Sequence, residues 1–222
     1  MPSTSEFFDA IKAGDRSRCD ALLAEAPALA VSVSPEGVTP ILFAVYHGRR
    51  ELAAALAEWK PDLSIFEAAA LGHTVRVTAL LDADPGLIGV HSPDGYGVLG
   101  LAVFFGHPEA TALLLARGGN PNDPARNAMQ VTALHAAAAQ RDPELAVRLT
   151  RMLLAHGADP NRRQQQEWTA LHAAAHSGNT LLVQLLLAMG AEPAPRTAQG
   201  KTPADLALEA GFIDLAAALR QV

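Results

Sequence analysis

Two histidines occupy matching places in two copies of one heptapeptide, and they are the residues of this chain best suited to chemistry. Thr-Ala-Leu-His-Ala-Ala-Ala runs over 132–138 and again over 169–175, so His135 and His172 each follow a threonine by three positions. Imidazoles are common zinc ligands, and an imidazole beside a hydroxyl can serve as a general base. No carboxylate or cysteine recurs beside either histidine, which argues against both kinds of site.

The remaining motifs give no support to enzymatic chemistry. The chain has no Gly-rich phosphate loop, no Ser-His-Asp arrangement and no pair of carboxylates at a useful spacing. We therefore expect no catalytic residue, no bound cofactor and no metal site. One alternative stays open, in which His47, His91 and His176, which have no evident structural role, form a small-ligand or enzymatic site near Pro61.

Composition and charge narrow the class of protein. Half of the 222 residues are hydrophobic, 5% are aromatic, and the net charge is −6. Such a chain is expected to fold. Its negative net charge gives no electrostatic attraction to phosphate backbones or anionic membranes, so neither nucleic acid nor a membrane is an expected partner. Cys19 is the only cysteine, which excludes an intramolecular disulfide and a cysteine zinc cluster. Because no run of 18 apolar residues and no leader-like segment occurs, we expect a soluble cytoplasmic protein.

The elements that carry the two histidines belong to an internal repeat. In the clearest unit Thr169 caps a short helix whose apolar positions recur at helical spacing, and Gly178 ends that helix. A second helix then runs back and stops at Gly190, before an extended polar stretch. This order returns about every 33 residues. The capping position is filled in turn by Thr39, Leu63, Gly97, Thr132, Thr169 and Thr202.

The repeat resembles the ankyrin repeat family. The shared landmarks are Thr-Ala-Leu-His in the two heptapeptides and Gly-Ala-Asp-Pro-Asn at 157–161, and the resemblance extends over about 6–220. The stretches at 7–15 and 65–73 resemble units of bacterial ankyrin proteins. The resemblance implies an all-α solenoid of about seven helix-turn-helix units with short extended or hairpin fingers.

The resemblance assigns residues 1–222 to a single ankyrin repeat domain with degenerate first and last units as caps. It also implies that His135 and His172 bond the threonine hydroxyl and neighbouring backbone, and so steady one unit on the next. The units lie approximately at 5–33, 34–61, 62–91, 92–126, 127–163, 164–196 and 197–222.

One unit is shorter than the others. Only 24 positions separate Thr39 from Leu63, nine fewer than the family period of about 33. Both helices of the unit are present, so the loss falls in the finger at 59–62, and a notch is predicted in the row of fingers. Asp62 or Ser64 is expected to cap the next helix.

Another unit is longer. Four residues are added after Pro143, which is about one helical turn and predicts a lengthened second helix with Leu149 and Leu153 on its buried face. This turn is either tolerated variation or an extra ledge for a partner.

The ankyrin resemblance implies that fingers and first helices line a concave binding surface. Exposed aromatic side chains in such a groove are typical anchors of protein interfaces. In a second interpretation Phe104 and Phe105 pack on the neighbouring finger and Trp168 covers a hairpin. The predicted protein-binding residues are Tyr46, His47, Leu71, Tyr96, Phe104, Phe105, Val131, Trp168 and His176.

The predicted function is that of a non-catalytic protein-binding module or scaffold. We expect a monomer, and the sequence does not identify its protein partner. Two alternatives remain: the ligand-binding or enzymatic protein described above, and a dedicated chaperone or immunity-type partner of a neighbouring gene product.

Overall fold

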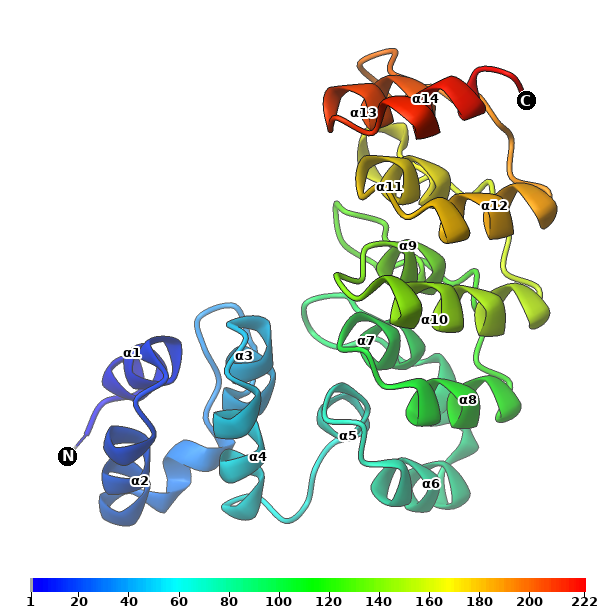
Figure 1. Ribbon diagram of the computed structural model, residues 1–222. Helices are drawn as coiled ribbons and strands as arrows, with labels where there is room; N and C mark the ends of the chain where they lie inside the picture. The colour runs from blue at the N-terminus through cyan, green and yellow to red at the C-terminus, as the bar shows by residue number, and fades with distance from the viewer. Residues whose placement is uncertain (1) are drawn as a thin grey trace.

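The protein is a bent stack of helix pairs. A computed structural model describes residues 2–222, which contain fourteen α-helices, three short 3-10 helices and no strand beyond an isolated bridge between His91 and Gly97. The helices follow one another as antiparallel pairs that stack into a solenoid (Figure 1). The predicted all-α repeat architecture is confirmed. Across residues 2–222, none of the helices combines the length and the apolar character needed to cross a membrane.

The seven helix pairs each contribute a first and a second helix. In Figure 1 the first helices line the inner side of the bend and the second helices lie on the outer side. The pairs are α1 (Thr4–Ala13) with α2 (Arg16–Glu25), α3 (Pro40–Tyr46) with α4 (Arg50–Glu58), α5 (Ile65–Ala70) with α6 (Thr74–Ala83), α7 (Val98–Phe104) with α8 (Pro108–Ala116), α9 (Ala133–Ala138) with α10 (Pro143–Ala155), α11 (Ala170–His176) with α12 (Thr180–Ala188), and α13 (Pro203–Glu209) with α14 (Ile213–Leu219). The 3-10 helices are η1 (Pro27–Val31), η2 (Pro85–Gly89) and η3 (Gln165–Glu167).

The first helices begin where the sequence predicts, at short polar side chains. Thr39 accepts a hydrogen bond from the Leu42 amide, and Thr202 forms a reciprocal capping box with Asp205. The cap of α5 is Ser64, which was one of the two predicted caps, the other being Asp62. The assignment of the repeat's capping position to Leu63 was therefore wrong by one residue. Leu63 is instead buried, because removing its apolar side chain from water is favourable.

Small residues and leucines alternate in the core. Ala137 and Ala174 are fully buried on first helices, next to buried Leu134 and Leu171. Alanine allows neighbouring helices to approach closely, while burial of each leucine side chain stabilises the fold by roughly 1.5–3 kcal/mol. The stack therefore has one continuous core that runs through successive units, although the chain has few aromatic residues.

The lengthened second helix forms as predicted. Helix α10 has 13 residues, whereas α8 and α12 have 9 each. Leu149 and Leu153 are fully buried on its inner face, so the additional turn continues the helix and does not loop out.

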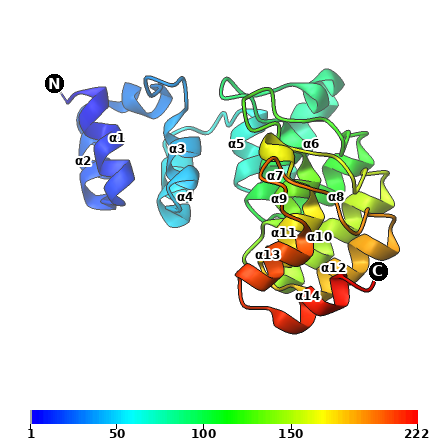
Figure 2. The same cartoon turned by 90° about the horizontal axis from the view of Figure 1, so that it is seen from above.

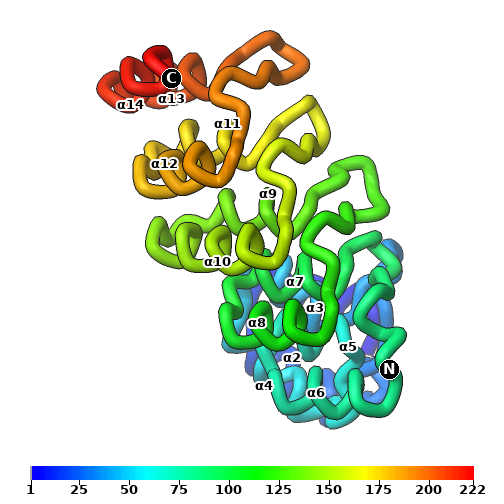
Figure 3. The backbone as a smooth tube through the Cα atoms, turned by 90° about the vertical axis from the view of Figure 1, so that its right-hand side faces the viewer, coloured from blue at the N-terminus to red at the C-terminus, as the bar shows by residue number. Residues whose placement is uncertain are grey.

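Hairpin-like fingers join most units. Each finger is closed by a backbone hydrogen bond between its ends, and successive fingers are joined in turn: the Arg126 amide donates to Gly95 O at 2.7 Å, and the Ala198 amide donates to Gln166 O at 2.9 Å. Figure 3 shows the later fingers projecting from one side of the stack. The closing bonds join Ser34 to Val38, Ser92 to Tyr96, Ala125 to Val131, Gln164 to Trp168 and Thr197 to Lys201.

The solenoid bends where the finger is missing. The chain passes from α4 to α5 through residues 59–64 without a hairpin, and α1–α4 form an arm beside the stack of α5–α14 (Figures 1 and 2). The predicted notch is narrowed. A Cβ built on Gly37 would lie 3.6 Å from the Pro93 side chain, so the two flanking fingers approach each other, and a cavity described below remains between them. With no finger between them, the units on either side of α5 converge.

Candidate functional site

His135 links its unit to the next one. Its Nδ1 accepts a hydrogen bond from the Thr132 amide at 3.2 Å and lies 2.8 Å from the Thr132 hydroxyl. Because Nδ1 is an acceptor, Nε2 carries the proton, which it donates to the carbonyl oxygens of Arg162 (3.0 Å) and Trp168 (3.2 Å). Burial lowers the pKa of His135 to about 4, so the ring is neutral at pH 7.

His172 repeats this arrangement one unit further on. Its Nδ1 accepts from the Thr169 amide at 3.1 Å, and Nε2 lies 3.2 Å from Pro195 O and 3.3 Å from Lys201 O. Burial also lowers the pKa of His172. Both ring nitrogens of each histidine are engaged, so the structural role implied by the ankyrin resemblance is confirmed. No cluster of three metal-ligating side chains occurs within residues 2–222.

The bend replaces histidine by a buried carboxylate. Glu67 stands three positions after Ser64, is 0% exposed, and accepts from the Ser64 amide and hydroxyl at 2.8 Å each. Lys60 Nζ lies 2.8 Å from both carboxylate oxygens. Burial alone raises the pKa of Glu67, but the hydrogen bonds from Lys60 and Ser64 outweigh it and the pKa falls below its usual value. The Ser-x-x-Glu spacing at 64–67 signals the contact between Ser64 and Glu67, but Glu67 was not among the predicted residues.

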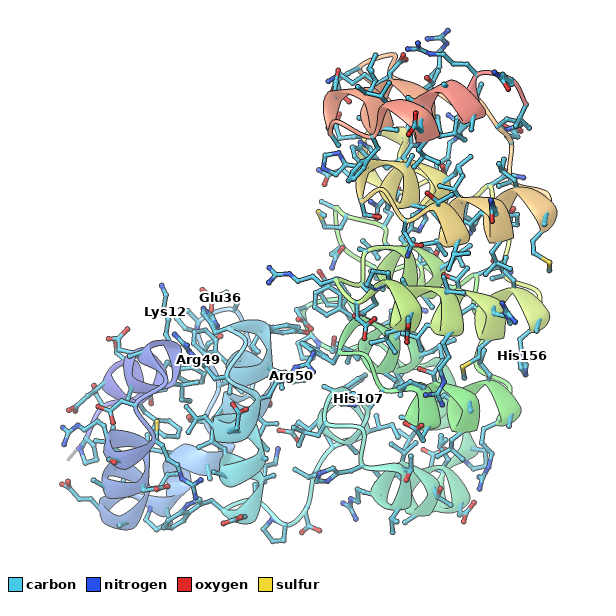
Figure 4. The ribbon with its side chains drawn as sticks, in the orientation of Figure 1. Lys12, Glu36, Arg49, Arg50, His107 and His156 are labelled. Atoms are coloured by element: carbon cyan, nitrogen blue, oxygen red, sulfur yellow. The ribbon has the colours of Figure 1, made fainter. Side chains whose placement is uncertain are left out.

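Aromatic side chains join the two units that converge at the bend. The Tyr46 ring lies 6.2 Å from the Tyr96 ring and 5.6 Å from the Phe105 ring, centroid to centroid. Arg50, at the start of α4, adds a hydrogen bond of 3.1 Å to Phe105 O (Figure 4). Phe105 is 4% exposed, so its prediction as an exposed binding residue was wrong. The missing finger brings α3 against the end of α7, and this contact covers the Phe105 ring.

The other predicted binding residues differ in exposure. Phe104, T-stacked on Phe105, is 53% exposed at the end of α7. Trp168 packs against His172 and His176, with ring centroids 5.8 and 6.1 Å apart. Among the predicted residues His47 and His176 are exposed, while Tyr46, Leu71, Tyr96, Val131 and Trp168 are half-buried.

The three histidines proposed as an alternative site do not share their surroundings. His47 lies on the Phe43 ring, and its Nδ1 is 2.9 Å from Phe43 O. His91, in the finger before α7, has a side chain that is 6% exposed and lies 3.3 Å from the Asp123 carboxylate. His176 packs on Trp168, four units along the chain from His47. Each histidine thus belongs to a different unit, and the structure gives no convergent site.

A cavity of about 210 Å³ opens at the bend, and we call it the bend pocket. Val38 and Tyr46 line it from the arm, and the second finger and α7 supply the rest of the wall. The Tyr46 hydroxyl is buried and has no hydrogen-bond partner. The full lining is Val38, Tyr46, Asp94, Tyr96, Leu101 and Phe104. The three aromatic residues are among the predicted binding residues and Asp94 is not, because only the convergence of two distant units places Tyr46 beside Asp94.

Comparison with known proteins identifies the family. The family model described as ankyrin repeats (3 copies) matches residues 65–164 and 146–221. This chain belongs to the ankyrin repeat family, whose repeats are protein-interaction modules.

Three curated relatives are similar to parts of the chain. The Caenorhabditis elegans homolog of transient receptor potential cation channel subfamily A member 1 is 32% identical over 157 residues, which cover 71% of this chain and 12% of the relative. Human cyclin-dependent kinase inhibitor 2A is 34% identical over 126 residues, 55% of this chain and 74% of the relative. Human cyclin-dependent kinase 4 inhibitor B is 34% identical over 116 residues, 50% of this chain and 77% of the relative. The chain thus spans only a small part of the channel homolog.

Proposed function

We propose that this protein is a non-catalytic module that binds a folded protein or peptide through the inner side of the bent solenoid, where the first helices and fingers lie. The exposure of Phe104 carries this proposal. Its ring is 53% exposed at the end of α7, next to the bend pocket. A large aromatic side chain on a concave surface is a typical energetic anchor of an interface. If the protein had no partner, this exposed ring would leave apolar surface in contact with water, which is unfavourable.

Further groups on the inner side support the proposal. Trp168 and His176 present an edge-on aromatic pair two first helices beyond Phe104, and His47 is exposed at the end of α3. Two of the similar proteins are named as inhibitors of cyclin-dependent kinases, so their names describe an effect on another protein. By analogy the partner of this chain is a protein, and the module performs no chemistry of its own.

We further propose that the protein is monomeric and cytoplasmic and does not bind nucleic acid. Cys19 is buried, and burial raises the pKa of its thiol to about 11, so the thiol is poorly reactive and suits a reducing compartment. The net charge of −6 opposes attraction to phosphate backbones.

The test requires a purified partner, identified by affinity capture and mass spectrometry and then confirmed with the two proteins alone. Phe104→Ala should weaken binding by about 2 kcal/mol or more, roughly thirtyfold, if Phe104 is an anchor. Val75 and Leu181 are matched apolar controls, 84% and 67% exposed on second helices at the outer side. Val75→Ala and Leu181→Ala should leave the affinity within about twofold. If these controls abolish binding and Phe104→Ala does not, the partner binds the outer side and the proposal fails.

A further inference from the structure

Two fingers of the protein have nearly the same sequence but face different surroundings. The first reads Ser-Pro-Glu-Gly-Val over 34–38, and the second reads Ser-Pro-Asp-Gly-Tyr over 92–96. In both, the serine hydroxyl donates a hydrogen bond to the acidic side chain, from Ser34 to Glu36 and from Ser92 to Asp94. The two carboxylates are therefore held in the same way by their own fingers.

The first of these carboxylates lies in a depression that already contains a cation. Glu36 shares this depression with Phe8, Phe43 and Lys12, and Figure 4 shows Lys12 and Glu36 at the same end of the arm. Lys12 is thus a cation near Glu36, although it forms no ion pair with it and Asp9 adds a second carboxylate to the depression.

The second carboxylate lies in the bend pocket, where no such cation is present. Asp94 forms no ion pair with any residue of 2–222. The walls around it are the rings of Tyr46, Tyr96 and Phe104 with aliphatic side chains between them. An aromatic face attracts a cation, and a carboxylate in a partly desolvated site attracts it more strongly than one in water.

The Tyr46 hydroxyl adds a second polar group to this pocket. It is buried close to the Asp94 carboxylate without a well-formed hydrogen bond to it, and burial first, then this carboxylate, raises the pKa of Tyr46, so the phenol stays protonated. An occupant that donates a hydrogen bond to the Tyr46 oxygen would give this buried hydroxyl a well-formed partner.

We propose that the bend pocket receives an arginine side chain of the protein partner. A guanidinium is planar, so it stacks on aromatic rings, and its fork of N–H donors reaches a carboxylate and a phenol oxygen together. The aliphatic stem of arginine suits the apolar part of the wall formed by Val38 and Leu101. A lysine ammonium is more strongly hydrated and lacks the flat face, so arginine is favoured over lysine. This inference rests on the proposed function and names the chemistry that the inner side recognises.

The test uses the full chain and a small probe, so it does not depend on an identified partner. The probe is N-acetyl-arginine N-methylamide, titrated into ¹⁵N-labelled protein at millimolar concentrations. We expect saturable shifts of the backbone amides of Gly95, Tyr96 and Phe104. N-acetyl-citrulline N-methylamide, which has nearly the same shape and no charge, should bind at least tenfold more weakly. The lysine analogue should bind about threefold more weakly than arginine.

Variants separate the pocket from a general charge effect. Asp94→Asn should weaken binding of the arginine probe at least tenfold, whereas Glu36→Gln, the matched change in the first finger, should leave it unchanged. Tyr46→Phe should weaken binding about threefold and leave the melting temperature equal or higher, because the hydroxyl it removes has no partner in the free protein. Phe104→Leu keeps an apolar wall and should still reduce arginine binding, because the flat ring is lost.

The proposal is overturned if the arginine probe shifts no amide of the pocket, if citrulline binds equally well, or if Glu36→Gln and Asp94→Asn have the same effect. Stronger binding of the lysine analogue would replace arginine by lysine as the occupant and overturn the proposal as stated. These outcomes do not decide the proposed function. A partner lost by Phe104→Ala but not by Asp94→Asn would keep the inner-side function and refute only the arginine pocket.

Discussion

The regular junction after α9 and the junction at the bend use the same helix position in opposite ways. The third helical residue accepts a hydrogen bond from the capping amide in both, through His135 Nδ1 in one and the Glu67 carboxylate in the other. The second partner differs. His135 meets carbonyl oxygens of the following finger and must donate to them, while Glu67 meets the Lys60 ammonium and must accept from it.

This difference follows from what surrounds each junction. After α9 and α11 the carbonyl oxygens of the finger require a donor, and a neutral imidazole is the side chain that accepts on one side and donates on the other. Where the finger is missing, a short loop brings Lys60 to the same place, and a carboxylate neutralises it. The regular junctions thus carry no buried charge, whereas the bend depends on a buried ion pair.

The largest effect is expected when the ion pair at the bend is broken. Lys60→Met leaves the fully buried Glu67 without its cation and should destabilise the protein by about 3–5 kcal/mol at pH 7. The loss should be smaller at pH 5, because the unpaired Glu67 then becomes protonated. Urea denaturation followed by circular dichroism measures both values. Lys12→Met, a change to a lysine without an ion pair in residues 2–222, serves as the control and should cost under about 0.5 kcal/mol.

Acid should weaken the regular junctions before it weakens the bend. His135 has a folded pKa of about 4, below the unfolded value of about 6.5, so the unfolded chain binds the proton first. Its contribution is present above pH 6.5 and is lost as the pH falls from about 6.5 to about 4, with about 2 kcal/mol lost by pH 5. Glu67 has a lowered folded pKa, so its contribution is present above the unfolded value of about 4.3 and is lost only at lower pH.

Hydrogen exchange at a series of pH values, corrected for the intrinsic exchange rate, tests this order. Between pH 6.5 and 5, amides of α9 and α11 should lose protection while those of α5 keep theirs. A His135→Gln variant should show a flatter dependence of stability on pH in this interval. Earlier loss of protection in α5 would mean that the ion pair, and not the histidine, is the acid-sensitive element.

A change at the capping residues should have a smaller and more uniform effect. Thr169→Ala and Ser64→Ala each remove one cap and should destabilise by about 1–2 kcal/mol. Ser64→Ala should cost more of the two, because the Ser64 hydroxyl donates to the charged carboxylate of Glu67 at 2.8 Å, whereas the Thr169 hydroxyl lies 3.0 Å from the neutral ring of His172. Thermal unfolding of both variants in the same buffer gives the comparison, and equal costs would show that Glu67 is fully satisfied by Lys60 and the backbone.

The regular junctions could be predicted from the sequence because each is local. A threonine, a histidine three positions later and a glycine at the helix end fix one unit, and the next unit repeats it. The bend was only half predicted. The spacing between Thr39 and the next cap shows that a finger is missing and predicts an open notch, but not how closely the flanking fingers approach. The convergence of the units on either side depends on contacts between residues about sixty positions apart, such as Tyr46 and Phe105, which no local pattern encodes.

The exposure of the predicted binding residues was equally hard to infer. Phe104 and Phe105 are neighbours at the end of one helix, yet the first is half exposed and the second buried. A helix advances about 100° per residue, so the two rings point in different directions, and only the position of the arm decides which one is covered. The sequence also does not single out Asp94 as a pocket residue. Its equivalent in the first finger, Glu36, has different neighbours, and the order of residues in the two fingers does not reveal this difference.

The smallest expected effect on stability concerns two adjacent arginines, one of which bonds within the arm and the other to the stack. Arg49 donates from Nε and Nη2 to Lys12 O at 3.2 and 3.1 Å, within the arm, whereas Arg50 donates to Phe105 O across the bend (Figure 4). Both side chains lie near solvent, so each substitution to alanine should cost at most about 1 kcal/mol. Their effects on shape should differ.

Arg50→Ala removes a polar contact between the arm and the stack, and the packing of α3 on α5 together with the aromatic contacts of Tyr46 then holds the bend. We expect small-angle X-ray scattering, or the distance between spin labels placed at positions 20 and 214, to report a wider and broader distribution of arm positions than in the wild type. Arg49→Ala should leave that distribution unchanged, because its bond lies on one side of the hinge. An equal change in both variants would mean that the bend is held by the packing of the whole arm, so that no single bond across α5 controls it.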